Sequence, residues 1–213
     1  MRAIQKHFIE SRAKGYADKN ANPKFANEYE KMLLLLARVR KDLKGINSMR
    51  TRAAIKKKYL PDFLPWINGA LQGKGKQDHV VTQWLVWSLD INDFDLAYKI
   101  ATYCIHYNLT LPVQFERTLP TFYVEELAKI AKRARDLEKP FKLQVLKNAL
   151  KLTEYSDISE IVLAKLWREV GLRQKARGSL CALKSLRKAL NLDPSCGVKG
   201  AIKTLEKRTK KTK

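Results

Sequence analysis

Apolar side chains recur at steps of three and four residues through most of this chain of 213 residues. These steps place side chains on one face of an α-helix, whereas a half-buried β-strand requires steps of two. The spacing therefore predicts an all-α fold, with a long N-terminal helix that carries a coiled-coil-like seam and a multi-helix hairpin bundle after it. The length leaves room for one sizeable core with extensions rather than two full domains.

The chain is expected to consist of segments that differ in net charge and in mobility. Residues 1–24 combine a short helix over 3–14 with a polar stretch, and the polar stretch favours mobility. The expected parts are a mobile arm (1–24), a basic long-helix region (25–60), a near-neutral helical core (61–140), a C-terminal helical bundle (141–207) and a basic tail (208–213).

The long helix is expected to start at Phe25 and to present one apolar seam. Its apolar residues alternate between steps of four and three, as in coiled coils. Such a seam can pack within the chain or against a second copy, and the flanking leucines at 33–35 favour the second. Gly45 is the expected weak point, and Pro61 and Pro65 are expected to end the helical region. The seam residues are Met32, Leu36, Val39, Leu43 and Ile46.

The middle of the chain is expected to form an antiparallel helical hairpin. Asp78 has the position of an N-cap, and the apolar residues over 80–89 surround most of the following helix. After a turn at 90–93, a second helix is expected over 94–105. A further helix is expected over about 120–137. Another is expected after the capping sequence at 157–160, and a third is expected to end at Asp193.

Charge is concentrated on both sides of this near-neutral middle. The chain has 43 lysine and arginine residues against 21 acidic ones, a net charge of +22. Same-sign blocks of this kind favour a polyanionic partner that releases counterions on binding. The basic residues predicted to bind DNA are Arg38, Arg40, Lys41, Lys44, Arg50, Arg52, Lys56, Lys57 and Lys58 in the first block, and Lys207, Arg208, Lys210 and Lys211 near the end.

Other classes of protein are poorly supported. The longest apolar run, over 32–37, is too short to span a bilayer, so a cytosolic protein without membrane contact is expected. Cys104, Cys181 and Cys196 are odd in number and lack zinc-ligand spacing, which favours buried free thiols. The glycines at 69–75 do not form a phosphate-binding loop, and no cofactor is expected.

Catalytic groups are also weakly indicated. A metal-dependent nuclease needs acidic oxygens that converge on magnesium. The weak candidates are Asp90, Asp93, Glu125 and Glu126, and the further carboxylates considered are Asp95 and Glu116. Asp93 is expected to cap a helix and Asp90 to close a turn, so structural roles already explain both. His7, His79 and His106 are not clustered. No metal site is predicted, and magnesium is expected only if the chain is itself a nuclease.

Several segments together resemble the small, or endonuclease-labelled, terminase subunit of temperate contractile-tailed bacteriophages. The resemblance covers about residues 25–207 and rests on packing and turn residues. It is carried by 59–66 (YLPDFLPW), 77–78 (QD), 87–97 (WSLDINDFDLA), 111–118 (LPVQFERT), 164–171 (AKLWREVG) and 197–199 (GVK).

The resemblance implies a host-cytoplasmic protein that binds double-stranded viral DNA at the packaging, or cohesive-end, site. Such a protein directs genome cleavage and packaging with a large ATPase subunit, and it assembles as a homo-oligomer, in particular a ring. Two alternatives remain open from the sequence. The chain is itself the site-specific endonuclease, or it is a basic helical RNA-binding adaptor.

Overall fold

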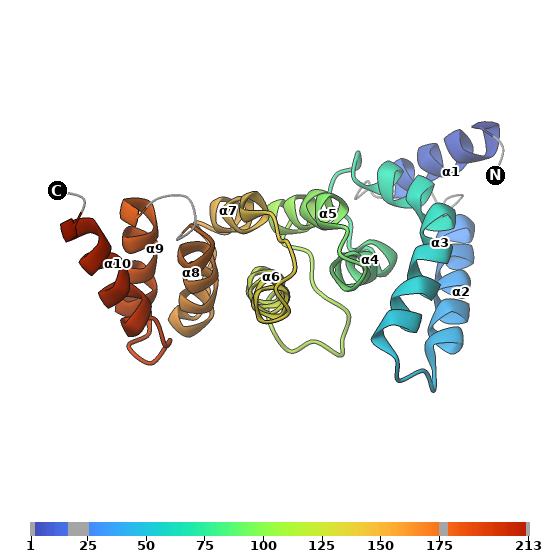
Figure 1. Cartoon of the computed structure of the whole chain (residues 1–213). Coiled ribbons are helices and arrows are strands. Elements are labelled where there is room, and N and C mark those ends of the chain that lie inside the picture. The colour runs from blue at the N-terminus through green and yellow to red at the C-terminus, as the bar shows by residue number, and fades with distance from the viewer. Residues whose placement is uncertain (1–2, 17–25, 175–178, 212–213) are drawn as a thin grey trace. The chain divides into compact units, whose positions relative to one another are not determined.

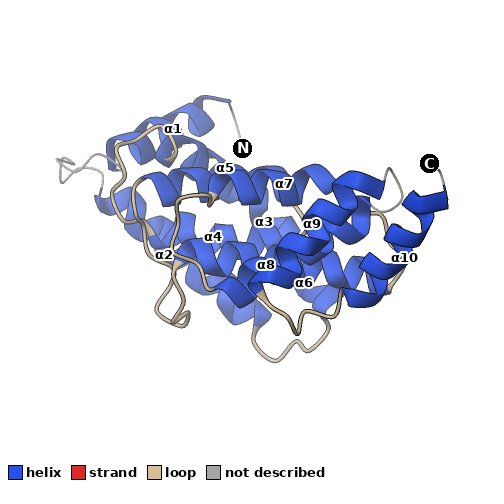
Figure 2. Ribbon diagram, turned by 90° about the vertical axis from the view of Figure 1, so that its left-hand side faces the viewer, coloured by secondary structure: helices blue, strands red, loops and turns tan. Residues whose placement is uncertain are grey.

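The computed structural model describes residues 3–16, 26–174 and 179–211, and within these ranges it contains helices and loops but no strand (Figure 1, Figure 2). The all-α prediction is confirmed. The helices are α1 (Ala3–Tyr16), α2 (Ala26–Leu43), α3 (Met49–Ala70), α4 (His79–Asp90), α5 (Phe94–His106), α6 (Leu119–Asp136), α7 (Leu143–Leu152), α8 (Glu160–Gln174), α9 (Ser179–Leu192) and α10 (Lys199–Lys211).

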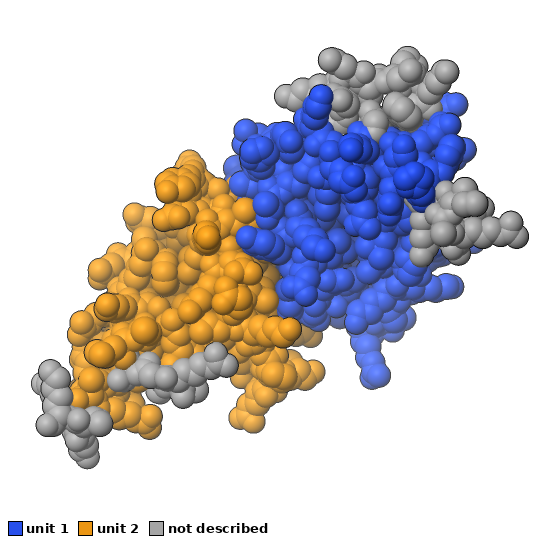
Figure 3. All heavy atoms as spheres, turned by 90° about the horizontal axis from the view of Figure 1, so that it is seen from above, with its two compact units in different colours: residues 1–119 blue, residues 120–213 orange. Residues whose placement is uncertain are grey.

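The chain divides into two compact units, coloured blue and orange in Figure 3. Unit 1 comprises Met1–Leu119 and unit 2 comprises Pro120–Lys213. The expectation of one core with extensions is therefore wrong. The basic long-helix region shares unit 1 with residues 61–119, whereas α6 groups with the C-terminal helices.

The expected single helix over 25–60 is instead two helices. Helix α2 ends at Leu43, and Gly45 then takes a positive φ of 79°, a conformation that glycine adopts at little cost. Helix α3 begins after Ser48, whose side chain accepts a hydrogen bond of 3.3 Å from the backbone N–H of Thr51. Ile46 therefore lies in the turn, beyond the end of the seam.

The seam packs within its own chain. Leu36, Val39 and Leu43 are all buried in unit 1, at 4% exposure or less. Met32 is partly buried. The prediction that the seam packs between two copies is therefore wrong, because these side chains already form part of an intramolecular core.

Helix α3 continues through both prolines that were expected to end it. Pro61 and Pro65 lie inside the helix, although each lacks the N–H that would complete a helical hydrogen bond. The second half of α3 places Phe63, Trp66 and Ile67 in the core, each fully buried. Burial of these large side chains offsets the cost of the two prolines.

Asp78 links α3 to the start of α4, the first helix of the predicted hairpin. Its buried carboxylate accepts hydrogen bonds from the backbone N–H groups of Val80 (2.8 Å) and Val81 (3.1 Å) and from Nε1 of Trp66 (2.8 Å). Burial raises the pKa of Asp78, and these three bonds oppose the rise. Asp93 caps α5 through the N–H of Leu96 at 3.1 Å. Both predicted caps are confirmed.

Helix α1 confirms the short helix expected near the N-terminus, but this helix is not a free arm. It packs so closely on α3 that a Cβ atom at Gly69 would lie 2.0 Å from the carbonyl oxygen of Glu10. Glycine is therefore the residue that allows the contact. The remainder of the expected arm, residues 1–2 and 17–24, lies outside the described residues.

Unit 2 is held by close packing between α8 and α9 and by one buried acid. A Cβ atom at Gly171 would lie 2.6 Å from Cδ2 of Leu186, so α9 approaches the backbone of α8 at this point. Glu169 is fully buried and accepts hydrogen bonds from Nε and Nη2 of Arg135 (3.1 and 3.3 Å) and Nε of Arg168 (3.2 Å). This pairing raises the pKa of Arg135.

The C-terminal helices follow the sequence pattern closely. Helix α9 ends at Leu192, before Asp193-Pro194, as predicted. Helix α10 extends to Lys211, so residues 208–211 of the expected tail are helical, and residues 212–213 lie outside the described part. Among the described helices, none combines the length and hydropathy needed to cross a membrane.

Candidate nucleic-acid interface

The α2–α3 hairpin of unit 1 carries an exposed group of basic side chains, which we call the hairpin cations. The side chains of Lys41, Lys44, Arg50 and Lys57 form no hydrogen bond or ion pair within the part of the chain that the structure describes. The one acid within residues 38–58, Asp42, accepts a hydrogen bond of 2.6 Å from the hydroxyl of Tyr59, which raises the pKa of Tyr59. The hairpin cations are Arg38, Lys41, Lys44, Arg50, Lys57 and Lys58.

Lys56 was predicted to bind DNA with its neighbours, and the structure contradicts this. It is 4% exposed, and its Nζ lies 2.5 Å from Oδ2 of Asp90. Nζ also lies 5.9 Å from the centre of the Trp87 ring. Since α4 ends at Asp90, Lys56 serves as an internal link between α3 and α4 rather than as part of the basic surface.

Two arginines from the same prediction also have intramolecular partners. Nη1 of Arg52 donates to the carbonyl oxygens of Leu43 (3.0 Å) and Ile46 (3.1 Å), which satisfies the C-terminal end of α2. Nη2 of Arg40 donates to Oε1 of Gln83 at 2.7 Å. Arg52 and Arg40 are therefore less available to a phosphate than the hairpin cations.

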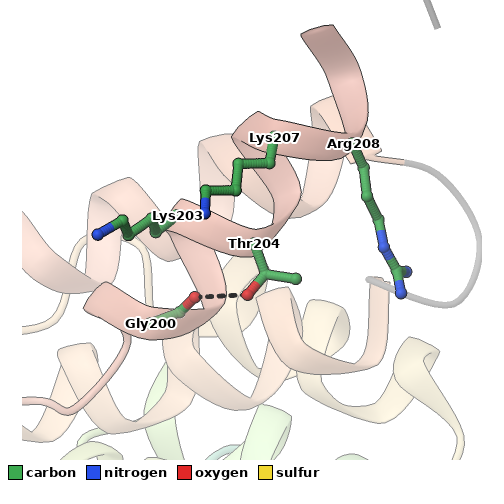
Figure 4. Close-up of a pocket in the computed structure, with 5 residues that line it drawn as sticks. All are labelled: Gly200, Lys203, Thr204, Lys207 and Arg208. Carbon is green, nitrogen blue, oxygen red and sulfur yellow. Dashed lines mark hydrogen bonds between the residues drawn. The ribbon is translucent and has the colours of Figure 1, made fainter. Parts of the chain in front are cut away.

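A second basic surface lies on α10, in unit 2. Val198, Ile202 and Leu205 face the buried core of α8 and α9. The opposite face of α10 contains a pocket of about 290 Å³ (Figure 4). The described residues that line it are Gly200, Lys203, Thr204, Lys207 and Arg208.

The prediction had included Lys207 and Arg208 but not Gly200 or Lys203. The sequence could have indicated Gly200 and Lys203, because the apolar residues at 198, 202 and 205 define the buried face of the helix and the pocket residues lie on the opposite face. Lys210 and Lys211 lie in the last turn of α10, and the positions of their side chains are not described.

Each of the four candidate catalytic carboxylates interacts with a group of its own unit. Asp90 and Asp93 belong to unit 1, where Asp90 pairs with Lys56 and Asp93 caps α5. Glu125 and Glu126 belong to unit 2, and both lie near Nζ of Lys129, at 3.7 and 2.8 Å.

No group of three or more acidic, histidine or cysteine side chains able to hold a metal occurs in the described residues. Asp95 and Glu116 are exposed. His7 lies in α1, His79 is the first residue of α4 and His106 is the last residue of α5. Cys104 and Cys196 are buried free thiols, as predicted. Cys181 is an exposed free thiol, so the prediction of burial is wrong for this residue. Burial raises the pKa of the Cys104 thiol.

Comparison with known proteins agrees with the sequence resemblance. The model of a family described as "Phage small terminase subunit" matches residues 33–161. The chain is 38% identical to the "Terminase, endonuclease subunit" of Escherichia phage P2, over 97% of the chain and 85% of that protein. It is 27% identical to the "Probable terminase, endonuclease subunit" of Haemophilus phage HP1, over 76% of the chain and 64% of that protein. No solved structure gives a significant match.

Proposed function

The chain belongs to the phage small terminase subunit family, and from this membership and its two basic surfaces we propose that it recognises viral DNA for packaging. The observation that carries the proposal is the exposure of basic side chains in both units. Within the described residues, no acid pairs with the side chains of Lys41, Lys44, Arg50 or Lys57 on the hairpin. The same holds for Lys203 and Lys207 of the α10 pocket. Phosphate oxygens are the natural partners of such surfaces.

The proposed partners follow from the role in packaging. We propose that the protein binds double-stranded DNA at the cohesive-end site and presents it to a large terminase ATPase subunit in the host cytoplasm. Phosphate contacts from the basic helices would set the position of the protein on the duplex, while base contacts would select the packaging site. In this role the protein directs the cut without making it.

DNA binding is expected to be strong at low salt and to weaken steeply as salt rises. Each neutralised phosphate contributes about −0.9 to the slope of log affinity against log salt concentration. The double substitution Lys57→Glu/Lys58→Glu is expected to lower affinity at least about tenfold and to reduce the slope by about 2. Gel shifts on phage-end and random DNA, over a salt series, measure both effects.

The matched control is Lys99→Glu/Lys139→Glu, which changes the net charge equally at exposed positions outside both basic surfaces. It is expected to retain most of the affinity. Lys56 is excluded from the test because it is buried. Binding that does not change with salt, or an equal loss in the control, would contradict the proposed surface. Equal binding of RNA and DNA would favour the RNA adaptor.

We further propose that the protein forms a homo-oligomer, in particular a ring, as its family resemblance implies. Leu34 lies beside the seam and is 72% exposed, whereas Leu36 is 2% exposed. Leu34→Glu is expected to shift the oligomer toward the monomer at unchanged melting temperature, because an exposed side chain adds little to the monomer core. Light scattering and thermal denaturation measure the two properties.

Leu36→Glu is the contrasting variant, and it is expected to lower the melting temperature because it buries a charge. Leu137→Glu, at a site that is 54% exposed in unit 2, controls for general loss of hydrophobic surface. A wild-type protein that stays monomeric at high concentration would overturn the proposed oligomer.

A second candidate function is endonuclease activity of the chain itself. The printed names of both relatives contain the words "endonuclease subunit", which is the observation in its favour. Magnesium would be the required cofactor for such an activity. The structural contacts of the acidic candidates argue against it, because these carboxylates pair with lysines or cap a helix.

A further inference from the structure

The α10 pocket contains a glycine that the fold does not require. Gly200 lies in the first turn of α10, its backbone is helical, and a Cβ atom added there would meet nothing within 4 Å. By contrast, Gly69 and Gly171 each lie against a neighbouring helix, and Gly45 has a positive φ. Neither conformation nor packing therefore explains Gly200. Glycine within a helix is less favourable than alanine, so this choice lowers helix stability.

The basic residues of α10 also act against the stability of the helix. Lys199, Lys203 and Lys207 follow one another at intervals of four residues, which places like charges on adjacent turns. Such pairs destabilise a helix. Within the described residues, neither the Lys203 nor the Lys207 side chain has a hydrogen-bond or ion-pair partner. The single acid of α10, Glu206, is already paired with Nη2 of Arg187 at 2.7 Å.

The side chains around Gly200 leave its backbone accessible. The hydroxyl of Thr204 donates to the carbonyl oxygen of Gly200 at 2.9 Å and so is turned back onto the helix (Figure 4). Lys203 and Lys207 border the same hollow. Glycine is the residue that permits a ligand to approach a protein backbone most closely. The result is a pocket with an uncovered floor and positively charged sides.

We infer that the α10 pocket is a contact site for the phosphodiester backbone of duplex DNA, with Gly200 providing close approach and Lys203 and Lys207 the charge. The inference rests on the proposed DNA-binding function and deepens it. A row of lysines along one helix matches a linear polyanion better than a small anion, since the charge continues from Lys203 to Lys199 and Lys207 on neighbouring turns. Contacts of this type carry no sequence preference.

The test separates helix stability from DNA affinity at one residue. In the full-length protein, Gly200→Ala and Gly200→Leu are expected to keep or raise the melting temperature, because both residues favour helix and their side chains enter open space. Affinity for a random-sequence duplex is expected to fall about threefold for alanine and about tenfold for leucine, tenfold corresponding to 1.4 kcal/mol. Fluorescence anisotropy and thermal denaturation measure the two properties.

The double variant Lys203→Gln/Lys207→Gln tests whether the two lysines contact phosphates. The matched control is Lys147→Gln/Lys151→Gln, which removes two exposed lysines from α7. The α10 pair is expected to reduce the salt slope by about 1.8, from about 0.9 for each lost phosphate contact. The α7 pair is expected to leave the slope within error of the wild type.

The outcomes distinguish this inference from the function on which it rests. A wild-type protein that does not bind the duplex overturns the proposed function. Wild-type binding that survives Gly200→Leu and the α10 lysine pair overturns the pocket alone. If inorganic phosphate binds the wild type but not Lys203→Gln/Lys207→Gln, while the affinity and the salt slope for the duplex are the same in both proteins, the pocket takes a small anion and the assignment to DNA is wrong.

Discussion

Replacing Lys56 by glutamate is expected to destabilise unit 1 strongly, an effect much larger than a loss of surface charge. The Lys56 side chain is 5% exposed, and its partner Asp90 is 33% exposed. Reversal of the buried charge places two carboxylates together and removes the link between α3 and α4. We expect the free energy of unfolding to fall by about 3 kcal/mol. This value is near the lower end of the range for breaking a buried ion pair, because Asp90 is partly exposed to solvent.

Urea denaturation of the variant against the wild type measures this loss. Lys57→Glu is the matched control, since it makes the same change at the next, exposed residue and is expected to shift the midpoint little. Lys56→Met/Asp90→Asn removes both charges and is expected to recover most of the lost stability. Equal midpoints for Lys56→Glu and Lys57→Glu would show that the ion pair is not structural.

The second large effect is expected in DNA cleavage. The isolated protein, given magnesium and DNA with the cognate packaging site, is expected not to cut specifically, whereas addition of the large subunit is expected to produce the specific cut. Metal-dependent hydrolysis requires carboxylates gathered around an open coordination position. Here Asp90 pairs with a lysine, Asp93 caps a helix, and Glu125 and Glu126 lie beside Lys129 in the other unit.

A nicking assay on supercoiled DNA tests this expectation with alanine substitutions at the four carboxylates, made one at a time. Circular dichroism and light scattering accompany each variant, because loss of the Asp93 cap or of the Asp90 ion pair also affects stability. Specific cutting by the protein alone, abolished by one substitution that leaves fold and assembly intact, would identify the chain as the nuclease. Acidic groups from adjacent copies would then have to form the site.

Local sequence signals predicted the middle of the fold well. The caps at Asp78 and Asp93 and the hairpin between 79 and 106 are present as expected, since they depend on residues close together in the chain. The prolines of α3 misled the prediction because tertiary packing decided the outcome. Burial of Phe63 and Trp66 holds a helix that local preference alone would end.

The candidate interface was predictable as a region but not residue by residue. A run of three lysines at 56–58 gives no indication that its first member turns inward to an acid 34 residues later. Likewise, the apolar steps of three and four in α2 could not reveal whether the seam faces its own chain or another copy. The hollow beside Gly200 could have been predicted from the apolar face of α10, but its floor and lysine borders become visible only when the side chains are placed.

The division into two units has a consequence for how the protein would hold a long duplex. Each unit carries its own basic surface, so one chain is a bivalent ligand for DNA on the proposed function. If both surfaces reach one duplex, binding of the first raises the effective concentration of the second, and the two weak contacts combine into avidity. Either surface can then release and rebind while the other retains the DNA. A duplex held in this way can shift along the protein without leaving it, which suits a substrate that must later move.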